Sequence, residues 1–423
     1  MTAEMTSTRT PELTPLADYL AGVLKRVRAL PPLDLDLTQA YGNVLADEVR
    51  AVGGLPAYDH AAIDGYAARW DDVGGPTVPR PVRINVVGDL SAASWRPVRL
   101  VAGTCFAVAA GAPLPATADV VVPMPWTDEG MASVEIREVP KRGYGVRRAG
   151  EEVVAGAVVG RAGDHITPAL VAVLAATGVG HVVVRPNPRV TVLATGDELV
   201  DAGRLSQPGQ VVDVNSHAVA AAAADAGAHA FRIGICDDDP EALRGLLEDQ
   251  CLRSDLVITT GGTGTGPGDM VRRILGRDGS VRFTELSVSP SFSLGFGTLN
   301  PPGVRAAEVP IVCLPGEPGA ALIAFEVLAR PLIQVLAGAE PVFRPSVRAH
   351  LLETLSSPLG LREFRPARVA ERRGGGYTVQ PLSGGPFTLS GLADANGLIV
   401  LGERVGGAPA GSTVDVLLLD RRR

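Results

Sequence analysis

The sequence is poor in aromatic residues, in cysteine and in positive charge, and each shortage narrows the class of protein. Only 4% of its 423 residues are aromatic, so small aliphatic side chains must fill the core. The four cysteines lie far apart and form no CxxC pair, so we expect reduced thiols, mostly in the core. The net charge is −7 and no stretch is strongly basic, so we expect no nucleic-acid partner.

We also find no sequence pattern typical of a signal peptide or a membrane-spanning helix. The polar residues 1–13 lack the apolar centre of a signal peptide. Charged, polar and proline residues interrupt the most apolar predicted helix, Ala320 to Ala337, and we interpret it as too broken to span a membrane. With 46% hydrophobic and 20% charged residues, the chain predicts a large core in two to four domains, at about 150 residues each. We expect a cytoplasmic protein without a membrane partner.

The most informative stretch is a glycine-rich loop, residues 259–269, between a predicted strand ending at Ile258 and a predicted helix starting at Met270. Glycine lets a ligand approach the backbone N–H groups, which favour an anion such as phosphate at a helix N-terminus. The loop has neither the Gly-Lys-Ser/Thr end of a P-loop nor the third glycine of a dinucleotide-binding motif. Asp269 at its end suits a site that also holds a cation. A glycine turn without a ligand is the plain alternative.

Acidic residues follow several predicted strands between residues 187 and 340. There, strands alternate with helices, which predicts an α/β fold with a mostly parallel sheet covered on both faces. Ligands of such folds bind at the carboxyl ends of the strands. Four successive strand ends carry the acids Asp197 and Glu198, Asp238, Asp269 and Glu317. Carboxylates at one edge repel one another unless a cation or a proton lies among them, so the pattern predicts Mg²⁺.

Four other regions have recognisable patterns. Short alternating runs from Pro79 to Val139 predict a β-rich module, and residues 341–423 predict a small β domain. A loop at residues 55–67 carries acids, a histidine and two tyrosines. Function concentrates in such loops, although an ordinary surface loop explains it equally well. The charge cluster at residues 147–152 is most simply a solvated surface.

Four motifs together resemble a known family. Asp59 to Ala67, Thr195 to Leu199, Thr260 to Gly264 and Leu314 to Pro318 occur in the order and spacing of the molybdopterin molybdenumtransferases, the MoeA family related to the E domain of gephyrin. The resemblance covers nearly the whole chain. It implies a discontinuous N-terminal part (13–50 and 145–186), a β-rich insert domain (51–144), a three-layer α/β molybdopterin-binding domain (187–340) and a C-terminal β domain (341–423).

The resemblance also implies a reaction, which is Mg²⁺-dependent insertion of molybdate into adenylylated molybdopterin with release of AMP. It implies a homodimer with a site shared between subunits, and other molybdenum-cofactor biosynthesis proteins as candidate partners. The acids expected to be catalytic are Asp64, Glu198, Asp238 and Asp269, and the last three are also the expected metal ligands. The expected cofactor-binding residues are Thr260, Gly261, Gly262, Thr263, Gly264, Ser289, Pro315, Gly316 and Pro318.

The chain departs from the family pattern mainly at cationic and hydroxyl positions. Ser289 and Phe292 stand where the family has two lysines, Ala110 stands where threonine is typical, and Pro386 stands where serine is typical. Molybdate and a terminal phosphate are dianions, and a site lined by carboxylates needs compensating positive charge. The candidate substitutes are Arg147, Arg148 and Arg282.

These substitutions leave two functions open. The first is the enzyme itself, and the second is a non-catalytic or altered-ligand paralogue that binds molybdopterin, the finished cofactor or a partner protein. We favour the enzyme because the acids are retained. A nucleotide pyrophosphatase or deamidase with a similar α/β domain is a weaker alternative, since the resemblance extends through the β-rich insert.

Overall fold

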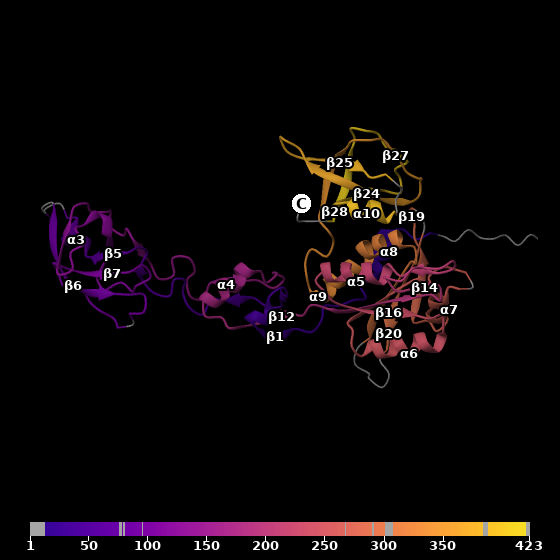
Figure 1. Cartoon of the computed structure of the whole chain (residues 1–423), viewed down its shortest axis with the longest axis horizontal. Coiled ribbons are helices and arrows are strands. Elements are labelled where there is room, and N and C mark those ends of the chain that lie inside the picture. The colour runs from indigo at the N-terminus through magenta and orange to yellow at the C-terminus, as the bar shows by residue number, and fades with distance from the viewer. Residues whose placement is uncertain are drawn as a thin grey trace, which may run out of the picture. The chain divides into compact units, whose positions relative to one another are not determined.

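The computed structural model describes residues 13–75, 78, 81–94, 96–266, 268–289, 292–300, 308–383 and 388–419. The chain forms two compact units (Figure 1). The larger unit comprises residues 1–33, 42–44 and 185–423, and the smaller comprises 34–41 and 45–184. This division is coarser than the four parts predicted from the sequence, whose boundaries stay predictions.

The larger unit contains a six-stranded sheet in the order β16-β13-β17-β21-β20-β18. The first four strands in this order are parallel, as predicted, and are β16 (His229–Cys236), β13 (Arg189–Thr195), β17 (Leu256–Thr260) and β21 (Val309–Leu314). Two antiparallel strands that the sequence pattern did not indicate, β20 (Ser293–Leu299) and β18 (Val281–Glu285), complete the sheet.

Helices cover both faces of this sheet, which gives the predicted three layers (Figure 1). One face packs against α1 (Leu16–Leu24), α5 (Asn215–Asp225), α8 (Pro318–Ala324), the π-helical turn η2 (Phe325–Ala329) and α9 (Arg330–Ala337). The other packs against α6 (Pro240–Cys251) and α7 (Met270–Leu275). Both cores consist mostly of Val, Leu, Ile and Ala, as the shortage of aromatic residues requires.

The helical run Pro318–Ala337 belongs to this core. Among the described residues it is the one helix long and apolar enough to cross a membrane by length and composition, with a mean hydropathy of 1.7. We expected the charged, polar and proline residues of this helix to exclude a membrane span, and its length and composition show that this expectation is wrong. Of its most apolar window, 72% is buried inside the protein. We interpret it as a core helix.

The order of the parallel strands reverses between β13 and β17. The chain leaves β13 through α5 to reach β16 on one side, and then returns through α6 to β17 on the other. Loops that leave two neighbouring strands in opposite directions open a crevice at their carboxyl ends, where ligands of such folds bind. Because β13 ends at Thr195 and β17 at Thr260, the crevice opens between these two residues.

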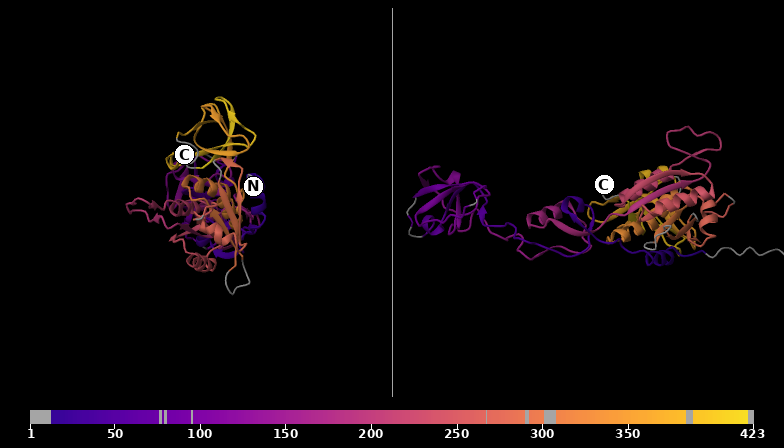
Figure 2. Two further views of the ribbon diagram at one scale, coloured as in Figure 1. Left: turned by 90° about the vertical axis from the view of Figure 1, so that its right-hand side faces the viewer. Right: turned by 90° about the horizontal axis from the view of Figure 1, so that it is seen from below.

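The C-terminal part of the larger unit is a closed β-barrel with its own core. Its strands are β22 (Ser346–Leu351), β24 (Arg362–Glu371), β25 (Tyr377–Pro381), β26 (Gly397–Leu401) and β28 (Thr413–Leu418). Because β24 pairs with both β25 and β26, the strands form a ring, visible in yellow in the left view of Figure 2. A short strand from the α/β part, β19 (Val288–Ser289), runs parallel to β24.

The smaller unit contains the predicted β-rich module. Its five-stranded sheet has the order β8-β5-β7-β6-β9. The strands are β5 (Gly65–Ala68), β6 (Val82–Leu90), β7 (Thr104–Val108), β8 (Val120–Pro123) and β9 (Ser133–Ile136). A two-stranded ribbon of β4 (His60–Ala61) and β10 (Val146–Arg147) precedes β5. Strand β4 lies within the loop at residues 55–67, which we call the acidic loop. Helix α4 (Pro168–Ala176) ends before Gly178, whose φ is +83°.

Candidate functional site

Two adjoining cavities, of about 430 and 790 Å³, lie at the carboxyl edge of the parallel strands. The first lies at the ends of β13 and β17, and the second lies on the side of the glycine loop that faces α7 and β20. Gly262, Asp269 and Gly316 line both cavities, so we treat them as one feature and call it the groove. Its position matches the reversal of strand order.

Most of the residues predicted for the site line the groove. They are Glu198, Asp238, Thr260, Gly261, Gly262, Thr263, Gly264, Asp269, Pro315, Gly316 and Pro318. Asp64 lies in the smaller unit, where its carboxylate accepts a hydrogen bond from the Ala110 amide at 2.7 Å. Ser289 lines neither cavity, because it pairs in β19 with Glu363 of β24. Pro386 lies outside the described residues.

The glycine loop adopts a conformation that only glycine tolerates. Gly261 and Gly262 have φ values of +93° and +64°. A Cβ atom on Gly261 would lie 2.8 Å from the carbonyl oxygen of Thr195, which is backbone and cannot move aside cheaply. Asp269 then closes the loop, because its carboxylate accepts hydrogen bonds from the amides of Gly264 at 2.8 Å and Gly266 at 2.6 Å. The loop is therefore built in advance of any ligand.

Two buried hydroxyl groups face the groove without a partner. Thr195 and Thr260 end neighbouring strands, line the first cavity and are 5% and 1% exposed. Neither Oγ1 atom makes a hydrogen bond with another described residue. An unpaired buried hydroxyl lowers stability unless a ligand or water satisfies it. The two hydroxyls therefore fit a polar ligand bound where the strand order reverses. Thr195 begins one of the four family motifs, but it was not among the predicted site residues.

A side chain that the sequence analysis did not select fixes one wall of the groove. Asn215, the first residue of α5, donates a hydrogen bond from Nδ2 to the carbonyl oxygen of Gly316 at 2.8 Å. Both residues line the first cavity. This bond ties the start of α5 to the turn that follows β21, and so holds Pro315 and Pro318 beside the glycine loop.

The predicted metal ligands do not form a ready-made cluster. Among the described residues, no three His, Cys, Asp or Glu side chains are placed to hold a metal ion. Glu198, Asp238 and Asp269 nevertheless line one cavity. Burial, and then the negative charges of Asp197 and Glu198, raise the pKa of Asp238. This excess of negative charge fits Mg²⁺, which is commonly held by one or two carboxylates together with substrate phosphates.

The raised pKa of Asp238 predicts a pH dependence of stability. The folded state binds the proton of this carboxyl more tightly than the unfolded state, so the free energy of unfolding falls as pH rises from about the ordinary value of 3.8 through the raised pKa. We expect Asp238→Asn to be more stable than wild type at pH 7 and equal to it at low pH. Urea unfolding between pH 4 and 7 measures this. Glu371→Gln, an exposed carboxylate of β24, is the control, and an equal change in both variants would contradict the prediction.

Comparisons with known proteins agree with this architecture. Residues 14–178 match the MoeA N-terminal region (domain I and II), residues 191–335 the probable molybdopterin binding domain, and residues 348–419 the MoeA C-terminal region (domain IV). Molybdopterin molybdenumtransferase 2 of Mycobacterium tuberculosis is 36% identical over 400 residues, which are 93% of this chain and 96% of that protein. The chain belongs to the molybdopterin molybdenumtransferase family.

Further relatives support the same assignment. Molybdopterin molybdenumtransferase 1 of Mycobacterium tuberculosis is 37% identical over 408 residues, covering 92% of this chain and 95% of that protein. The crystal structure of the molybdopterin biosynthesis MoeA protein from Pyrococcus horikoshii has a TM-score of 0.78 and 26% identity, and covers 97% of this chain and 100% of that chain. The family resemblance and the fold class predicted from the sequence are confirmed.

The positions where this member departs from the molybdenumtransferase pattern have distinct surroundings. Phe292 lines the second cavity and is 7% exposed, so an apolar ring lies where the family resemblance implies an ammonium group. Arg272 of α7 lines the same cavity, and its Nη1 donates to Glu285 at 2.9 Å and to the carbonyl oxygen of Thr263 at 3.1 Å. Arg272 was not predicted, because α7 was recognised only by its apolar positions.

The candidate substitutes Arg147 and Arg148 are both ion-paired within the smaller unit. Arg147 contacts Glu151 and Glu152. Arg148 contacts Asp59 at 2.5 Å. A hydrogen bond from the Ala149 amide, followed by the Arg148 guanidinium, lowers the pKa of Asp59. The acidic loop is therefore held by its own local charge pairs.

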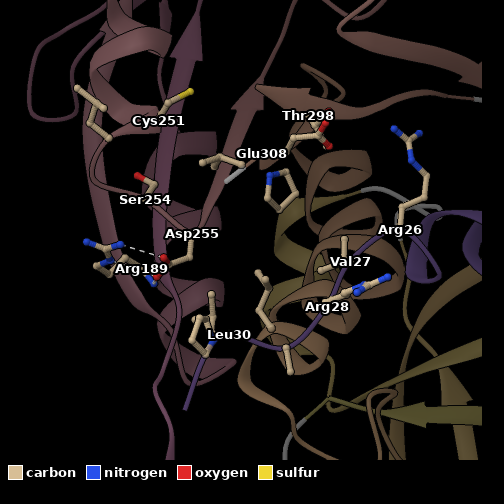
Figure 3. A pocket seen from close by; sticks show the side chains of 16 residues that line it. Arg26, Val27, Arg28, Leu30, Arg189, Cys251, Ser254, Asp255, Thr298 and Glu308 are labelled. Atoms are coloured by element: carbon tan, nitrogen blue, oxygen red, sulfur yellow. Dashed lines mark hydrogen bonds and ion pairs between the residues drawn. The ribbon is translucent and has the colours of Figure 1, made fainter. Parts of the chain in front are cut away.

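A further cavity of about 580 Å³ lies at the opposite, amino-terminal edge of the sheet (Figure 3). One wall carries Arg189, whose Nη2 lies 2.9 Å from Asp255, and Val27 and Arg28 lie across from this pair. No glycine of the described part of the chain lines this cavity, and its lining is partly apolar. We therefore place the functional site at the groove.

Proposed function

We propose that this protein inserts molybdate into adenylylated molybdopterin with release of AMP, assisted by Mg²⁺, in the cytoplasm. It would act as a transferase of molybdenum cofactor biosynthesis. The observation that carries the proposal is the groove, where a preformed glycine loop, acidic side chains and the unpaired hydroxyls of Thr195 and Thr260 meet at the strand reversal. Its support is membership of the molybdenumtransferase family along nearly the whole chain.

In this function the residues of the groove bind and orient the pterin. The hydroxyl groups of Thr195 and Thr260, which have no partner among the described residues, would donate hydrogen bonds to it, and Gly261 would let it approach the backbone of the loop. Asn215 holds the opposite wall in place through Gly316. Immobilising a substrate between fixed walls lowers the entropic cost of reaching the reactive geometry.

The acids of the groove would hold the metal. Glu198, Asp238 and Asp269 are the residues that would bind Mg²⁺, which supplies positive charge against the phosphate of the adenylate. The oxygens of Asp269 that accept the loop amides keep further lone pairs, so this carboxylate can serve both the loop and a cation. Binding of the metal would also relieve the repulsion that raises the pKa of Asp238.

We also propose a homodimer in which Asp64 of one subunit reaches the groove of the other. Asp64 is exposed, and among the described residues its carboxylate accepts a hydrogen bond from the Ala110 amide of its own unit. Sedimentation velocity at micromolar concentration should show a dimer. A monomer alone under these conditions would contradict a composite site.

Reconstitution of an apo molybdoenzyme tests the proposed reaction directly. The assay contains this protein, adenylylated molybdopterin, Mg²⁺ and increasing molybdate. We expect activation of the apoenzyme and stoichiometric AMP, both lost when Mg²⁺ is chelated. A second candidate function, a carrier that binds molybdopterin without inserting metal, is favoured by the apolar Phe292 in the groove. Tight pterin binding without AMP release or activation would identify the carrier.

The two unpaired threonines yield a prediction about pterin binding. Thr195→Val and Thr260→Val keep the shape of the side chain and remove its hydroxyl, so stability without ligand should stay equal or rise by about 1 kcal/mol. Affinity for adenylylated molybdopterin should fall roughly fivefold for each lost hydrogen bond. Thermal unfolding and fluorescence titration measure the two quantities.

Thr191→Val is the matched control. Its Oγ1 bonds Ser254 at 2.6 Å and Gln250 at 3.2 Å inside the core, so its removal should lower stability and leave pterin affinity unchanged. If Thr195→Val and Thr260→Val lose stability as Thr191→Val does, their hydroxyls have partners within the protein and the ligand assignment is wrong.

A further inference from the structure

Arg232 belongs to the edge strand of the six-stranded sheet, and its side chain contacts the start of α5. Strand β16 lies at the edge, and the residues on either side of Arg232, Phe231 and Ile233, are 51% and 41% exposed. The side chain of Arg232 is only 24% exposed. Its Nε donates a hydrogen bond to the Oγ of Ser216 at 2.6 Å, and its Nη2 lies 3.3 Å from the carboxylate of Asp213. These two contacts fix the position of the guanidinium group.

Asp213 is the buried acid that this arginine neutralises. It is 2% exposed and lines the first cavity of the groove. Its carboxylate accepts hydrogen bonds from the amide of Ser216 at 3.0 Å and from the hydroxyl of the same residue, and so closes the turn that begins α5. Removing one partner of a buried ion pair leaves an uncompensated charge, which is strongly destabilising. The turn from Asp213 to Ser216 therefore depends on Arg232 for its conformation.

The same turn carries Asn215, which fixes one wall of the groove. Asn215 lies between Asp213 and Ser216 in the chain and donates its hydrogen bond to the carbonyl oxygen of Gly316 at 2.8 Å. A series of contacts therefore runs from Arg232 through the turn to Asn215 and on to Gly316. Arg232 itself lines neither cavity, so its effect on a bound ligand passes through these residues.

Arg232 also holds the long loop that leads into this turn. Residues 201–210 are exposed and connect β14 (Leu199–Val200) to β15 (Val211–Val212), two short parallel strands beside the first cavity. Among the described residues, the hydrogen bonds of this loop stay within it except at Asp201, which pairs with the Nη2 of Arg232. One guanidinium group therefore holds both the loop and the start of α5.

We propose that Arg232 is a positioning residue of the groove, which holds the start of α5 and the loop 201–210 in place and thereby sets the affinity for adenylylated molybdopterin. This assignment rests on the proposed function of the groove. A guanidinium group suits the task because its planar fork of donors reaches three acceptors at once in a fixed geometry, whereas a lysine ammonium lies on a flexible stem. Without Arg232 the turn would relax, and the wall that Asn215 holds would loosen.

Fluorescence titration with adenylylated molybdopterin measures this effect without requiring turnover. We expect Arg232→Met, which keeps the length of the side chain but not its charge, to weaken binding about tenfold. Arg232→Lys keeps the charge and should recover part of the loss. Arg189→Met is the matched control, because Arg189 lies on the neighbouring strand β13 and pairs with Asp255 at the amino-terminal edge of the sheet, away from the groove. Equal affinities of the two methionine variants overturn the assignment.

A double-mutant cycle with Asn215→Ala tests the route by which Arg232 acts. Asn215→Ala alone should weaken binding of adenylylated molybdopterin by a similar factor. Adding Arg232→Met to it should weaken binding less than about twofold further, because both changes remove the same restraint on Gly316. Losses that multiply in the double variant would mean that Arg232 acts by another route, and they overturn the assignment.

Limited proteolysis with trypsin tests the hold on the loop without any ligand. Arg204 lies in the exposed loop, and trypsin cleaves after arginine. We expect cleavage after Arg204 to be several-fold faster in Arg232→Met than in wild type or in Arg189→Met, because the loop has lost its ion pair with the sheet. Equal rates in all three proteins would mean that Arg232 does not hold the loop, and they overturn the assignment.

Steady-state kinetics in the reconstitution assay separate positioning from a general loss of stability. Arg232→Met should raise KM for adenylylated molybdopterin about tenfold and leave kcat within about twofold, since the acids of the groove remain. A lower kcat with an unchanged KM reports a smaller folded fraction and overturns the assignment. Wild-type protein that binds adenylylated molybdopterin but releases no AMP refutes the proposed reaction and leaves the role of Arg232 intact. Wild-type protein that does not bind it refutes both.

Discussion

Asp269→Ala should reduce molybdenum insertion at least 100-fold while costing the fold only about 1 kcal/mol. The carboxylate lines both cavities of the groove, so its charge acts on every part of the proposed site. It also holds the amides of Gly264 and Gly266. These two charge-assisted hydrogen bonds hold the loop in the orientation that the reaction needs. Without them we expect the activation free energy to rise by about 3 kcal/mol or more, which lowers kcat/KM about 100-fold. Water replaces the carboxylate at these partly exposed amides, so global stability falls little.

Asp278→Ala is the matched control for this variant. Asp278 also accepts a backbone hydrogen bond, from Ser280 at 3.0 Å, but it does not line the groove. Its loss should leave kcat/KM unchanged. Asp269→Asn keeps the size of the side chain and one acceptor oxygen, so it should lie between alanine and wild type. Retention of activity within tenfold by Asp269→Ala would remove Asp269 from the site.

The parallel half of the sheet was predictable because buried strands are recognisable as apolar runs. Four such runs, each followed by a helical pattern, were enough to predict a three-layer α/β domain. The antiparallel strands β18 and β20 were missed because β20 contains glycines, which are typical of turns. A Cβ atom on Gly297 would lie 1.8 Å from the carbonyl oxygen of Ser280. Glycine is therefore required here because the segment that leads into β18 packs directly against β20. The residues around Gly297 do not by themselves indicate this contact with a separate segment of the chain.

The acids of the site were predictable for a related reason. Parallel strands bring their carboxyl ends to one edge, so Glu198, Asp238 and Asp269 were expected to meet, and they line one cavity. The partners of these side chains were not predictable. Asp269 accepts hydrogen bonds from two loop amides, and two threonine hydroxyls lack a partner among the described residues. Both features depend on how the segments pack in three dimensions, which the sequence pattern does not indicate. The assignment of these residues to catalysis and to metal binding stays a prediction.

The alignment of Ser289 and Phe292 with two lysines shows a further limit of sequence comparison. Both positions were expected at the anion, yet only Phe292 lines the groove, while Ser289 lies in β19 opposite Glu363. Glu363 is 2% exposed and is paired with Arg365. A change at residue 289 would therefore act on the contact between the α/β part and the barrel before it acted on a bound anion.

Phe292→Lys should destabilise the larger unit by about 3 kcal/mol and, at the same time, lower the molybdate concentration needed for half-maximal insertion. Phe292 packs in the core that joins the sheet to α1, α5, α8 and α9, and loss of a buried phenyl ring costs about 3 kcal/mol or more. The lysine stem can extend into the second cavity, which places its ammonium group in an acidic groove and adds the charge an oxyanion lacks. Thermal unfolding and molybdate titration measure the two effects.

Phe292→Leu separates packing from charge. Leucine retains an apolar side chain of smaller volume, so it should cost about 1 kcal/mol and leave the molybdate dependence unchanged. A lysine variant as stable as the leucine variant would mean that the ring contributes little to the core. A lysine variant that is destabilised but needs as much molybdate as wild type would mean that the anion does not enter the second cavity.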